Sequence, residues 1–344
     1  MQVHWHHQKT LMAEMKKILN YLFEHKSLSR EQAKEVLYNI SNKVYSDTEI
    51  AAFITVYLMR SITIDELQGF RDALMELCLP VDLGNSELVD IVGTGGDGKN
   101  TFNISTLSCF IVAGTGNKVA KHGNYGASST SGSSNVMEQL GHVFKADVTG
   151  LKKELEEANI CFLHAPLFHP ALKVVGSIRK NLGVRTFFNM LGPLVNPAVP
   201  KYQLIGVYNP EMARIYNYLL QQGGSAFTII HGLDGYDEIS LTGDTKVITN
   251  TGEKILSAEA LGKRTVAPAD IYGGNSVEDA AKIFLSILKG NGTWAQNAVV
   301  LANSAMALQC TGKYDNYATC YQLAVDSLES GKAYQSLQKL ISLA

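Results

Sequence analysis

The spacing of apolar residues changes near residue 88, and this change constrains the fold more than any other feature of the chain. Before it the pattern is helical only, with apolar residues at helical spacing. These residues are Leu11, Met15, Ile18, Leu19 and Leu22. Three capping boxes mark helix starts, pairing Ser29 with Gln32, Ser46 with Glu49, and Thr63 with Glu66. The first part of the chain is therefore expected to fold as a small helical domain.

From residue 88 onward, short apolar runs alternate with amphipathic helical stretches. The runs lie at residues 88–92, 118–120, 160–163, 202–207 and 226–230. This alternation predicts an α/β fold, a mainly parallel sheet flanked by helices on both faces. Because Pro80 and Gly84 interrupt the chain between the two patterns, we predict a small all-helical domain at residues 1–84 and a larger α/β domain at residues 85–344.

Composition excludes several classes of protein. With 344 residues and 46% hydrophobic content the chain can bury a large core, and a net charge of −2 argues against a generic nucleic-acid or membrane-surface binder. The five cysteines, an odd number without C-x-x-C spacing, are typical of thiols in a reducing compartment. The polar residues 1–10 resemble no signal peptide, so we expect a cytoplasmic protein. A frayed terminus explains His4, His6 and His7 more simply than a metal site does.

Two turns that follow predicted strands indicate a phosphate site. The first, at residues 93–98, is rich in glycine and leaves backbone N–H groups able to approach an anion closely. Its glycines also fit the G-x-G-x-x-G dinucleotide pattern, which needs an acid about 20 residues further on to hold the ribose hydroxyls. The chain has Lys121 and His122 there, and a cation favours a second anionic group. The alternative is that both loops serve only as tight turns.

Polar side chains follow both turns. The first turn is followed by Asn103, Ser105 and Thr106, and the second by Ser128, Ser129, Ser131 and Ser133. Ligands of open α/β sheets bind at the carboxyl ends of the strands, so both turns are expected to share one site. A serine-rich loop taken alone is usually just solvated.

An acidic turn at residues 231–238 follows the predicted strand at 226–230. Its adjacent carboxylates, Asp237 and Glu238, are hard oxygen ligands. Magnesium typically binds one or two carboxylates and completes its shell with water and substrate phosphate. The alternative is an exposed turn in which Asp234 and Asp237 only cap the backbone.

Several motifs, in order along most of the chain, resemble those of the anthranilate phosphoribosyltransferase family. They lie at residues 90–98, 101–106, 121–124, 168–180, 188–197 and 234–238. The resemblance implies a nucleoside phosphorylase/phosphoribosyltransferase-like fold in which helices near residues 170–197 join the small domain, with an active site at the domain hinge and a homodimer formed through the small domain. The related pyrimidine nucleoside phosphorylases share the glycine loop and are the enzyme alternative. A relative without transferase activity could bind nucleic acid, which the near-neutral charge and the intact acidic pair argue against.

The resemblance also implies binding residues, position by position. Phosphoribosyl pyrophosphate (PRPP) would be held by Gly93, Gly96, Asp97, Thr101, Asn103, Ile104, Ser105, Thr106, Lys121, Ser129 and Ser133. Anthranilate would contact Gly93, Asn124, His169 and Arg179. Magnesium, about two ions per subunit, would bind through Ser105, Asp237 and Glu238. Only small-molecule partners are implied, with no nucleic acid and no membrane.

The chemistry of pyrophosphate displacement suits these residue types. Negative charge builds on the leaving group, where Lys121, magnesium and backbone N–H groups stabilise it. The attacking aromatic amine is neutral and needs no strong general base, for which only His122 and His169 are candidates. One departure from the family is Tyr125, where relatives commonly have an arginine. The second turn therefore has one cation fewer near the substrates.

Overall fold

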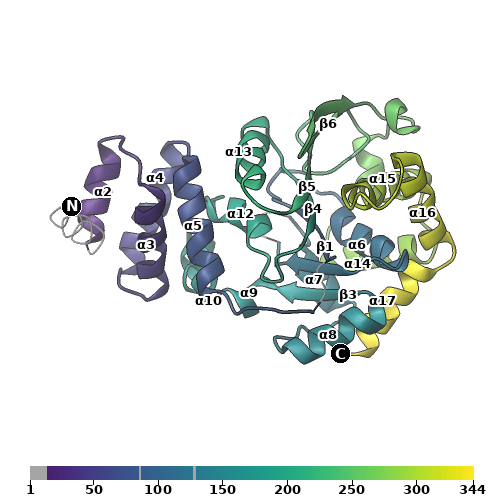
Figure 1. Cartoon of the computed structure of the whole chain (residues 1–344), viewed down its shortest axis with the longest axis horizontal. Coiled ribbons are helices and arrows are strands. Elements are labelled where there is room, and N and C mark those ends of the chain that lie inside the picture. The colour runs from purple at the N-terminus through teal and green to yellow at the C-terminus, as the bar shows by residue number, and fades with distance from the viewer. Residues whose placement is uncertain (1–13, 85–86, 127–128) are drawn as a thin grey trace. The chain divides into compact units, whose positions relative to one another are not determined.

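The chain divides into two compact units in the computed structural model, which describes residues 14–84, 87–126 and 129–344 (Figure 1). The helical unit comprises residues up to Pro80 together with Ala165–Pro197, and the α/β unit comprises Val81–His164 and Ala198–Ala344. Some residues named above lie outside the described parts of the chain. They are His4, His6, His7, Leu11 and Ser128.

The helical unit is built from helices that begin where the sequence predicts. Its first helices are α2 (Met15–Phe23), α3 (Arg30–Ser41), α4 (Asp47–Met59) and α5 (Ile64–Leu77). Ser29, Ser46 and Thr63 form complete capping boxes at the starts of α3, α4 and α5, which confirms all three predictions. The later elements are α9 (Ala165–Phe168), α10 (Pro170–Val174), α11 (Gly176–Leu182), α12 (Phe188–Leu191) and the 3₁₀ helix η1 (Gly192–Leu194).

Aromatic side chains join the early and late segments of the helical unit. Phe187, from the later segment, stacks on Phe70 with ring centroids 4.6 Å apart, and its edge meets Tyr57 at 5.0 Å. Phe53 packs edge-on against both Phe70 and Phe187. Such buried ring pairs add about 0.5–1.5 kcal/mol each beyond their area burial, so this cluster fixes residues 165–197 onto α4 and α5.

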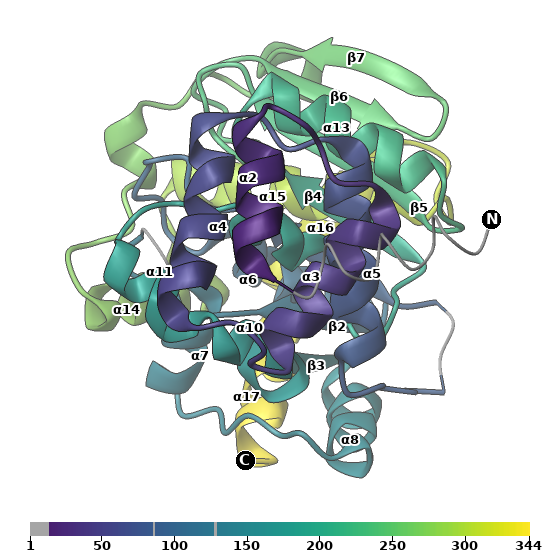
Figure 2. The same cartoon turned by 90° about the vertical axis from the view of Figure 1, so that its left-hand side faces the viewer.

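The α/β unit contains a seven-stranded sheet in the order β3-β2-β1-β4-β5-β6-β7. Its strands are β1 (Val89–Gly93), β2 (Val119–Gly123), β3 (Ile160–His164), β4 (Tyr202–Gly206), β5 (Ala226–Gly232), β6 (Thr245–Thr249) and β7 (Gly252–Leu256). β1 to β5 pair in parallel, which confirms the predicted sheet. The antiparallel hairpin β6–β7 at one edge, seen in Figure 2, was not predicted, because β7 is exposed and has no apolar run.

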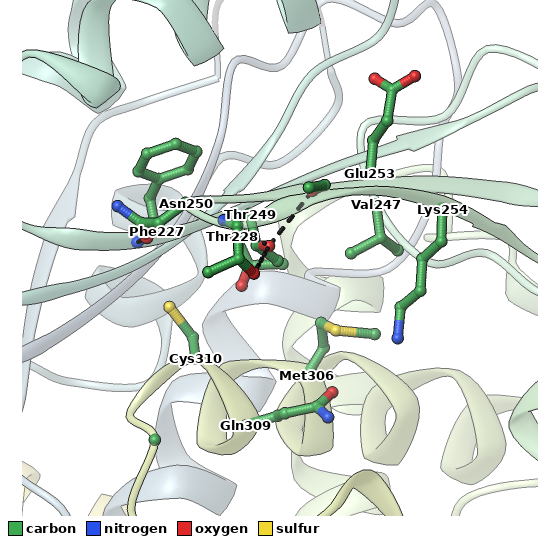
Figure 3. Close-up of a pocket in the computed structure, with 13 residues that line it drawn as sticks. Phe227, Thr228, Val247, Thr249, Asn250, Glu253, Lys254, Met306, Gln309 and Cys310 are labelled. Carbon is green, nitrogen blue, oxygen red and sulfur yellow. Dashed lines mark hydrogen bonds between the residues drawn. The ribbon is translucent and has the colours of Figure 1, made fainter.

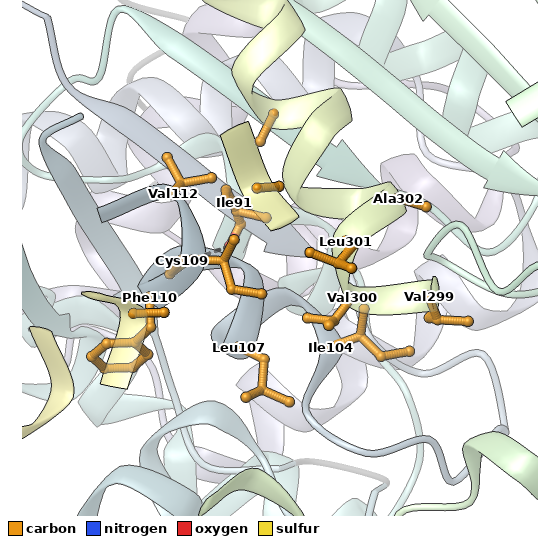
Figure 4. Packing of buried hydrophobic residues seen from close by; sticks show 14 of the residues in the cluster. Ile91, Ile104, Leu107, Cys109, Phe110, Val112, Val299, Val300, Leu301 and Ala302 are labelled. Carbon is orange, nitrogen blue, oxygen red and sulfur yellow. Dashed lines mark hydrogen bonds between the residues drawn. The ribbon is translucent and has the colours of Figure 1, made fainter. Parts of the chain in front are cut away.

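Helices pack on the sheet of the α/β unit. They are α6 (Ile104–Gly114), α7 (Ser133–Gln139), α8 (Val148–Ala158), α13 (Pro210–Gln221), α14 (Val277–Leu288), α15 (Trp294–Cys310), α16 (Tyr317–Glu329) and α17 (Lys332–Ser342), with 3₁₀ helices η2 (Glu259–Leu261) and η3 (Pro268–Ile271). α6 packs on β1, and α15 packs on β4, β5 and α6. Figure 4 shows Leu107 and Phe110 of α6 and Val300 of α15 among the side chains of this core. Because α6 is buried along its length, its first residues are held firmly at the end of β1.

All five cysteines are free thiols, and Cys109, Cys161 and Cys320 are buried. In the parts of the chain that the structure describes, no helix is both long and apolar enough to cross a membrane.

Candidate functional site

The first glycine loop, residues 93–98, adopts a left-handed backbone conformation that glycine accommodates readily. Gly95, Gly96 and Gly98 have φ values of +63°, +76° and +75°, in the left-handed region that costs other residues free energy. The N–H group of Gly95 donates a hydrogen bond of 2.7 Å to Oδ2 of Asp237. The loop therefore binds one of the protein's own carboxylates.

The acidic turn approaches the backbone at two further glycines so closely that no side chain fits there. A Cβ atom at Gly93 would lie 2.4 Å from Oδ2 of Asp237, and one at Gly206, the last residue of β4, would lie 1.5 Å from the Asp237 carbonyl oxygen. Real Cβ atoms make no such contacts. The acidic turn thus packs directly on the ends of two neighbouring parallel strands.

The carboxylates of the acidic turn are buried, which contradicts the alternative of an exposed turn for Asp237 and Glu238. Their exposed fractions are 8% and 9%. Oε2 of Glu238 accepts a hydrogen bond from the Thr101 hydroxyl at 3.2 Å, and Oε1 accepts one from the Ser105 N–H at 3.3 Å. Asp234 fits that alternative better, because its carboxylate caps the turn by accepting a hydrogen bond from the Thr242 hydroxyl.

The pKa values of the Asp237 and Glu238 carboxyl groups in the acidic turn are raised. Burial, together with the negative charge of Asp97, raises the pKa of Asp237 to about 7. Burial and the charges of Asp237 and Asp97 raise the pKa of Glu238 well above its usual value. A bound cation would lower both pKa values, because it favours the charged carboxylates.

Two adjacent carboxylates are a donor set that magnesium commonly uses. Among the described residues, no group of three or more His, Cys, Asp and Glu side chains is arranged to hold a metal ion. Asp237 and Glu238 offer adjacent carboxylates, and Ser105 is bonded to Glu238. A cation here would take its remaining ligands from water and from phosphate oxygens, as magnesium commonly does.

Lys121 lies in β2 with only 2% of its surface exposed. Its ammonium group donates a hydrogen bond of 2.6 Å to the main-chain oxygen of Ile91 in β1. The N–H group of the next residue, His122, donates to Oδ1 of Asp90 at 3.4 Å. The Lys121 ammonium group is therefore held within the sheet.

A direct hydrogen bond joins the two loops. The Asn103 side chain, at the start of α6, donates from Nδ2 to the carbonyl oxygen of Ser131 at 3.0 Å. Oδ1 of Asn103 and the hydroxyl of Thr94 are buried and lack a hydrogen-bond partner within the described residues. Buried polar atoms normally have partners, so each of these two atoms can pair with a water molecule or a ligand. Thr94 was missed, although its place inside the glycine motif was a signal.

The remaining predicted site residues fall into the two units. Gly96, Asp97, Thr101, Ile104, Thr106, Asn124, Ser129 and Ser133 lie in the α/β unit, in or after the two turns. His169 and Arg179 lie in the helical unit. Burial lowers the pKa of His169 to about 4, so its ring is neutral near pH 7. Arg179 of α11 donates from Nη2 to Oδ1 of Asn189 at 3.3 Å, with its guanidinium 5.5 Å from the Phe188 ring centroid.

A separate cavity in the α/β unit contains none of the predicted site residues. It has a volume of about 540 Å³ and lies between strands β5 to β7 and the end of α15 (Figure 3). Thr228, Lys254, Met306 and Cys310 are among its lining residues. The cavity is therefore separate from the two loops and the acidic turn.

Comparison with known proteins identifies the family of the chain. Residues 85–334 match the glycosyl transferase family a/b domain, and residues 16–78 match the helical bundle domain of that family. The chain is 58% identical to the anthranilate phosphoribosyltransferase of Christiangramia forsetii over 96% of this chain and 99% of the relative. The crystal structure of anthranilate phosphoribosyltransferase from Thermus thermophilus superposes with a TM-score of 0.87 at 32% identity, covering 94% of this chain and 98% of that one.

The Saccharomyces cerevisiae enzyme provides structures with ligands. Its complex with PRPP and Mg superposes with a TM-score of 0.84 at 28% identity, covering 92% of this chain and 93% of that one. Its complex with 4-fluoroanthranilate also has a TM-score of 0.84, at 27% identity and 98% coverage of both chains. The extent of these matches, over both units, shows that the chain belongs to the anthranilate phosphoribosyltransferase family.

Proposed function

We propose that the chain transfers the 5-phosphoribosyl group of PRPP to the amine of anthranilate, giving N-(5-phosphoribosyl)anthranilate and pyrophosphate in tryptophan biosynthesis. The observation that carries this proposal is the buried pair of Asp237 and Glu238 packed against a glycine loop, in a chain 58% identical to an enzyme of that name. No feature of the site favours a pyrimidine nucleoside phosphorylase instead.

PRPP binds along the two loops in this proposal. The N–H groups of the first loop, including that of Gly96, bind the pyrophosphate, together with the hydroxyls at the start of α6. Ser129 and Ser133 donate from the second loop, and Lys121 supplies a cation. Support comes from the hydrogen bond between Asn103 and Ser131, which brings these donors to one edge of the sheet.

Magnesium is held by Asp237, Glu238 and Ser105, with about two ions per subunit. When bound, the metal balances the charge of the leaving pyrophosphate. The buried carboxylates with raised pKa values support this assignment, because a cation removes the free-energy cost of their charge. The chain's own contribution is to fix the two carboxylates through the N–H groups of Gly95 and Ser105.

Anthranilate is bound by Gly93, Asn124, His169 and Arg179. The planar guanidinium of Arg179 suits a carboxylate, and its hydrogen bond to Asn189 holds it in one orientation. His169 and His122 are the candidates for accepting a proton from the amine, and the lowered pKa of His169 keeps its imidazole neutral but makes it a weak base. Orientation of the neutral amine carries much of the rate.

The protein acts in the cytoplasm as a homodimer that forms through the helical unit. Exposed apolar side chains on that unit support the proposal, among them Phe23, Val44 and Met59, which are 61%, 54% and 88% exposed. Its partners are the two small-molecule substrates, and it binds neither nucleic acid nor membranes.

A fluorescence assay tests the activity. Anthranilate fluorescence should fall only when PRPP and magnesium are both present, and adding NAD should change nothing. Phosphate-dependent cleavage of a pyrimidine nucleoside, with anthranilate unchanged, would replace this proposal with the phosphorylase alternative.

A further inference from the structure

The serine loop, defined here by residues 124–126 and 129–135, has its two ends joined by hydrogen bonds. The carbonyl oxygen of Asn124 accepts from the N–H group of Ser134 at 3.1 Å and from the hydroxyl of Ser133 at 3.3 Å. Ser133 and Ser134 are the first residues of α7. The strand end at Asn124 is therefore tied to the start of a helix.

A second set of hydrogen bonds closes the serine loop further along. Oδ1 of Asn135 accepts from the N–H groups of both Gly126 and Gly132, at 2.9 and 3.0 Å. A Cβ atom at Gly132 would lie 2.2 Å from the Gly126 nitrogen, and one at Gly126 would lie 2.9 Å from the Ser129 carbonyl oxygen. The backbone segments approach so closely that only glycine fits at these positions.

Tyr125 connects this loop to two rigid elements. Its ring meets the ring of His164, the last residue of β3, edge to face, with centroids 4.9 Å apart and an interplanar angle of 78°. Its hydroxyl donates to Oε1 of Glu138 in α7 at 3.4 Å. The tyrosine therefore bridges the end of a strand and the helix that follows the loop.

His164 is itself held in one orientation. Its Nδ1 lies 2.8 Å from the hydroxyl of Ser134, and its ring stacks on Phe144 with centroids 4.4 Å apart and an interplanar angle of 12°. Only 5% of its surface is exposed. A buried, stacked and hydrogen-bonded ring gives Tyr125 a fixed surface to pack against.

We propose that Tyr125 is a positioning residue that clamps the serine loop, through the ring of His164 and the hydroxyl of Ser134. Both clamp residues in the loop are direct neighbours of residues assigned to substrates: Tyr125 follows Asn124, and Ser134 follows Ser133. The clamp holds these neighbours in place without adding a charge. The effect of the clamp on substrate binding rests on the proposed function, whereas the effect of the clamp on the order of the serine loop does not.

Amide hydrogen exchange tests the clamp without any substrate. In Tyr125→Ala, the amides of Gly126, Gly132 and Ser134 should exchange roughly 3- to 10-fold faster than in the wild type, as expected for loss of one aromatic contact. Peptides from the rest of the sheet should be unchanged. Tyr125→Phe, which keeps the ring, should stay within about 2-fold of the wild type. Unchanged exchange in Tyr125→Ala would overturn the proposal.

Kinetics test the positioning role. Tyr125→Ala should raise KM for both substrates roughly 3- to 10-fold and change kcat by less than about 2-fold, because order is lost and no reacting group is removed. Tyr125→Phe should restore both KM values. Tyr218→Ala, which removes an exposed tyrosine of α13 in the same unit, is the matched control and should behave as the wild type.

The two assays distinguish the clamp from the proposed function. An inactive wild-type protein whose exchange still responds to Tyr125→Ala would keep the clamp and refute the activity. An active enzyme in which Tyr125→Ala leaves both KM values and the exchange unchanged would keep the activity and refute the clamp. Equal damage from Tyr125→Phe and Tyr125→Ala would also refute it, since the ring contact would then be irrelevant.

Discussion

The two loops follow neighbouring strands of one sheet, yet the protein holds them by different means. The first glycine loop rests on buried carboxylates, with Gly95 donating to Asp237. The serine loop is held mainly by uncharged groups, namely the Asn135 amide and the rings of Tyr125 and His164, with one exposed hydrogen bond from Tyr125 to Glu138. Under the proposed function, the first loop is coupled to the charges that act on the leaving pyrophosphate, whereas the second loop contributes to substrate affinity. Changes to the first should therefore be the more damaging.

The largest effect is expected when the charges beneath the first loop are removed. In Asp237→Asn combined with Glu238→Gln, kcat should fall by about 100-fold or more, because metal-based charge stabilisation is worth several kcal/mol. The amide oxygens can still accept from Gly95 and Ser105, and the two side chains no longer carry buried negative charge, so the melting temperature should be kept or rise. Steady-state kinetics and calorimetry check both. Retained activity with a lowered melting temperature would mean that the carboxylates only hold the turn together.

Arg179 lies in neither loop. Because it is proposed to bind anthranilate and not PRPP, its substitution should affect only one of the two substrates. Arg179→Ala should raise KM for anthranilate roughly 10- to 150-fold, the cost of losing a charge-assisted hydrogen bond, with little change for PRPP. Lys180→Ala, on the same helix α11, is the control. If KM rises equally for both substrates, Arg179 supports the structure of the helical unit and does not bind anthranilate.

Gly93→Ala tests whether the acidic turn fixes the first loop by close packing. The added methyl group would meet Asp237 at 2.4 Å and force the turn away. Overpacking costs about 1–3 kcal/mol, so the melting temperature should drop by several degrees and kcat by about 10-fold. Gly224→Ala adds a methyl group where nothing lies within 4 Å and should leave both values unchanged. Wild-type behaviour of Gly93→Ala would show that the turn yields easily.

The smallest effect is expected at Glu154 of α8, a buried carboxylate outside both loops. Burial raises its pKa from 4.5 to about 7, and Lys145, 3.3 Å away, offsets only part of that cost. A raised carboxyl pKa means that the wild type loses stability as the pH rises from about 4.5 to about 7. Glu154→Gln should therefore raise the melting temperature at pH 8 and have less effect at pH 5, with activity unchanged.

Thermal scans across this pH range check the prediction for Glu154. Glu157→Gln, which neutralises an exposed glutamate of the same helix, should leave the pH dependence as in the wild type. A melting temperature that falls at pH 8 in Glu154→Gln would mean that the ion pair with Lys145 outweighs burial. Glu154 and Asp237 both have raised pKa values. Comparing the Glu154 variant with the combined Asp237 and Glu238 variant therefore separates the effect of a buried charge on stability from its effect on activity.

Local sequence patterns predicted most of the fold. The five parallel strands and the three capping boxes were found because apolar runs and S/T-x-x-E/Q patterns report the structure of adjacent residues. The hairpin β6–β7 was missed because an exposed edge strand has no apolar signal. The position of the acidic turn after a strand followed from the apolar run at residues 226–230 that precedes it.

Contacts between residues distant in sequence could not be predicted. Residue 93 must be glycine because Asp237 packs against it, and the sequence around residue 93 does not indicate that contact. Tyr125 was interpreted as the loss of a cation, whereas its ring packs on His164 from another strand. The orphaned hydroxyl of Thr94 is visible only once burial is known. Such contacts depend on how strands align in the sheet, which single motifs do not encode.

The central claim is that the acidic turn and the first glycine loop together form a metal-dependent PRPP site. Calorimetric titration of PRPP into the wild type, with and without magnesium, tests it most directly when repeated with the combined Asp237→Asn and Glu238→Gln variant. We predict that magnesium tightens PRPP binding by about 10-fold or more in the wild type and not in the variant. Equal magnesium dependence in both proteins would contradict the account.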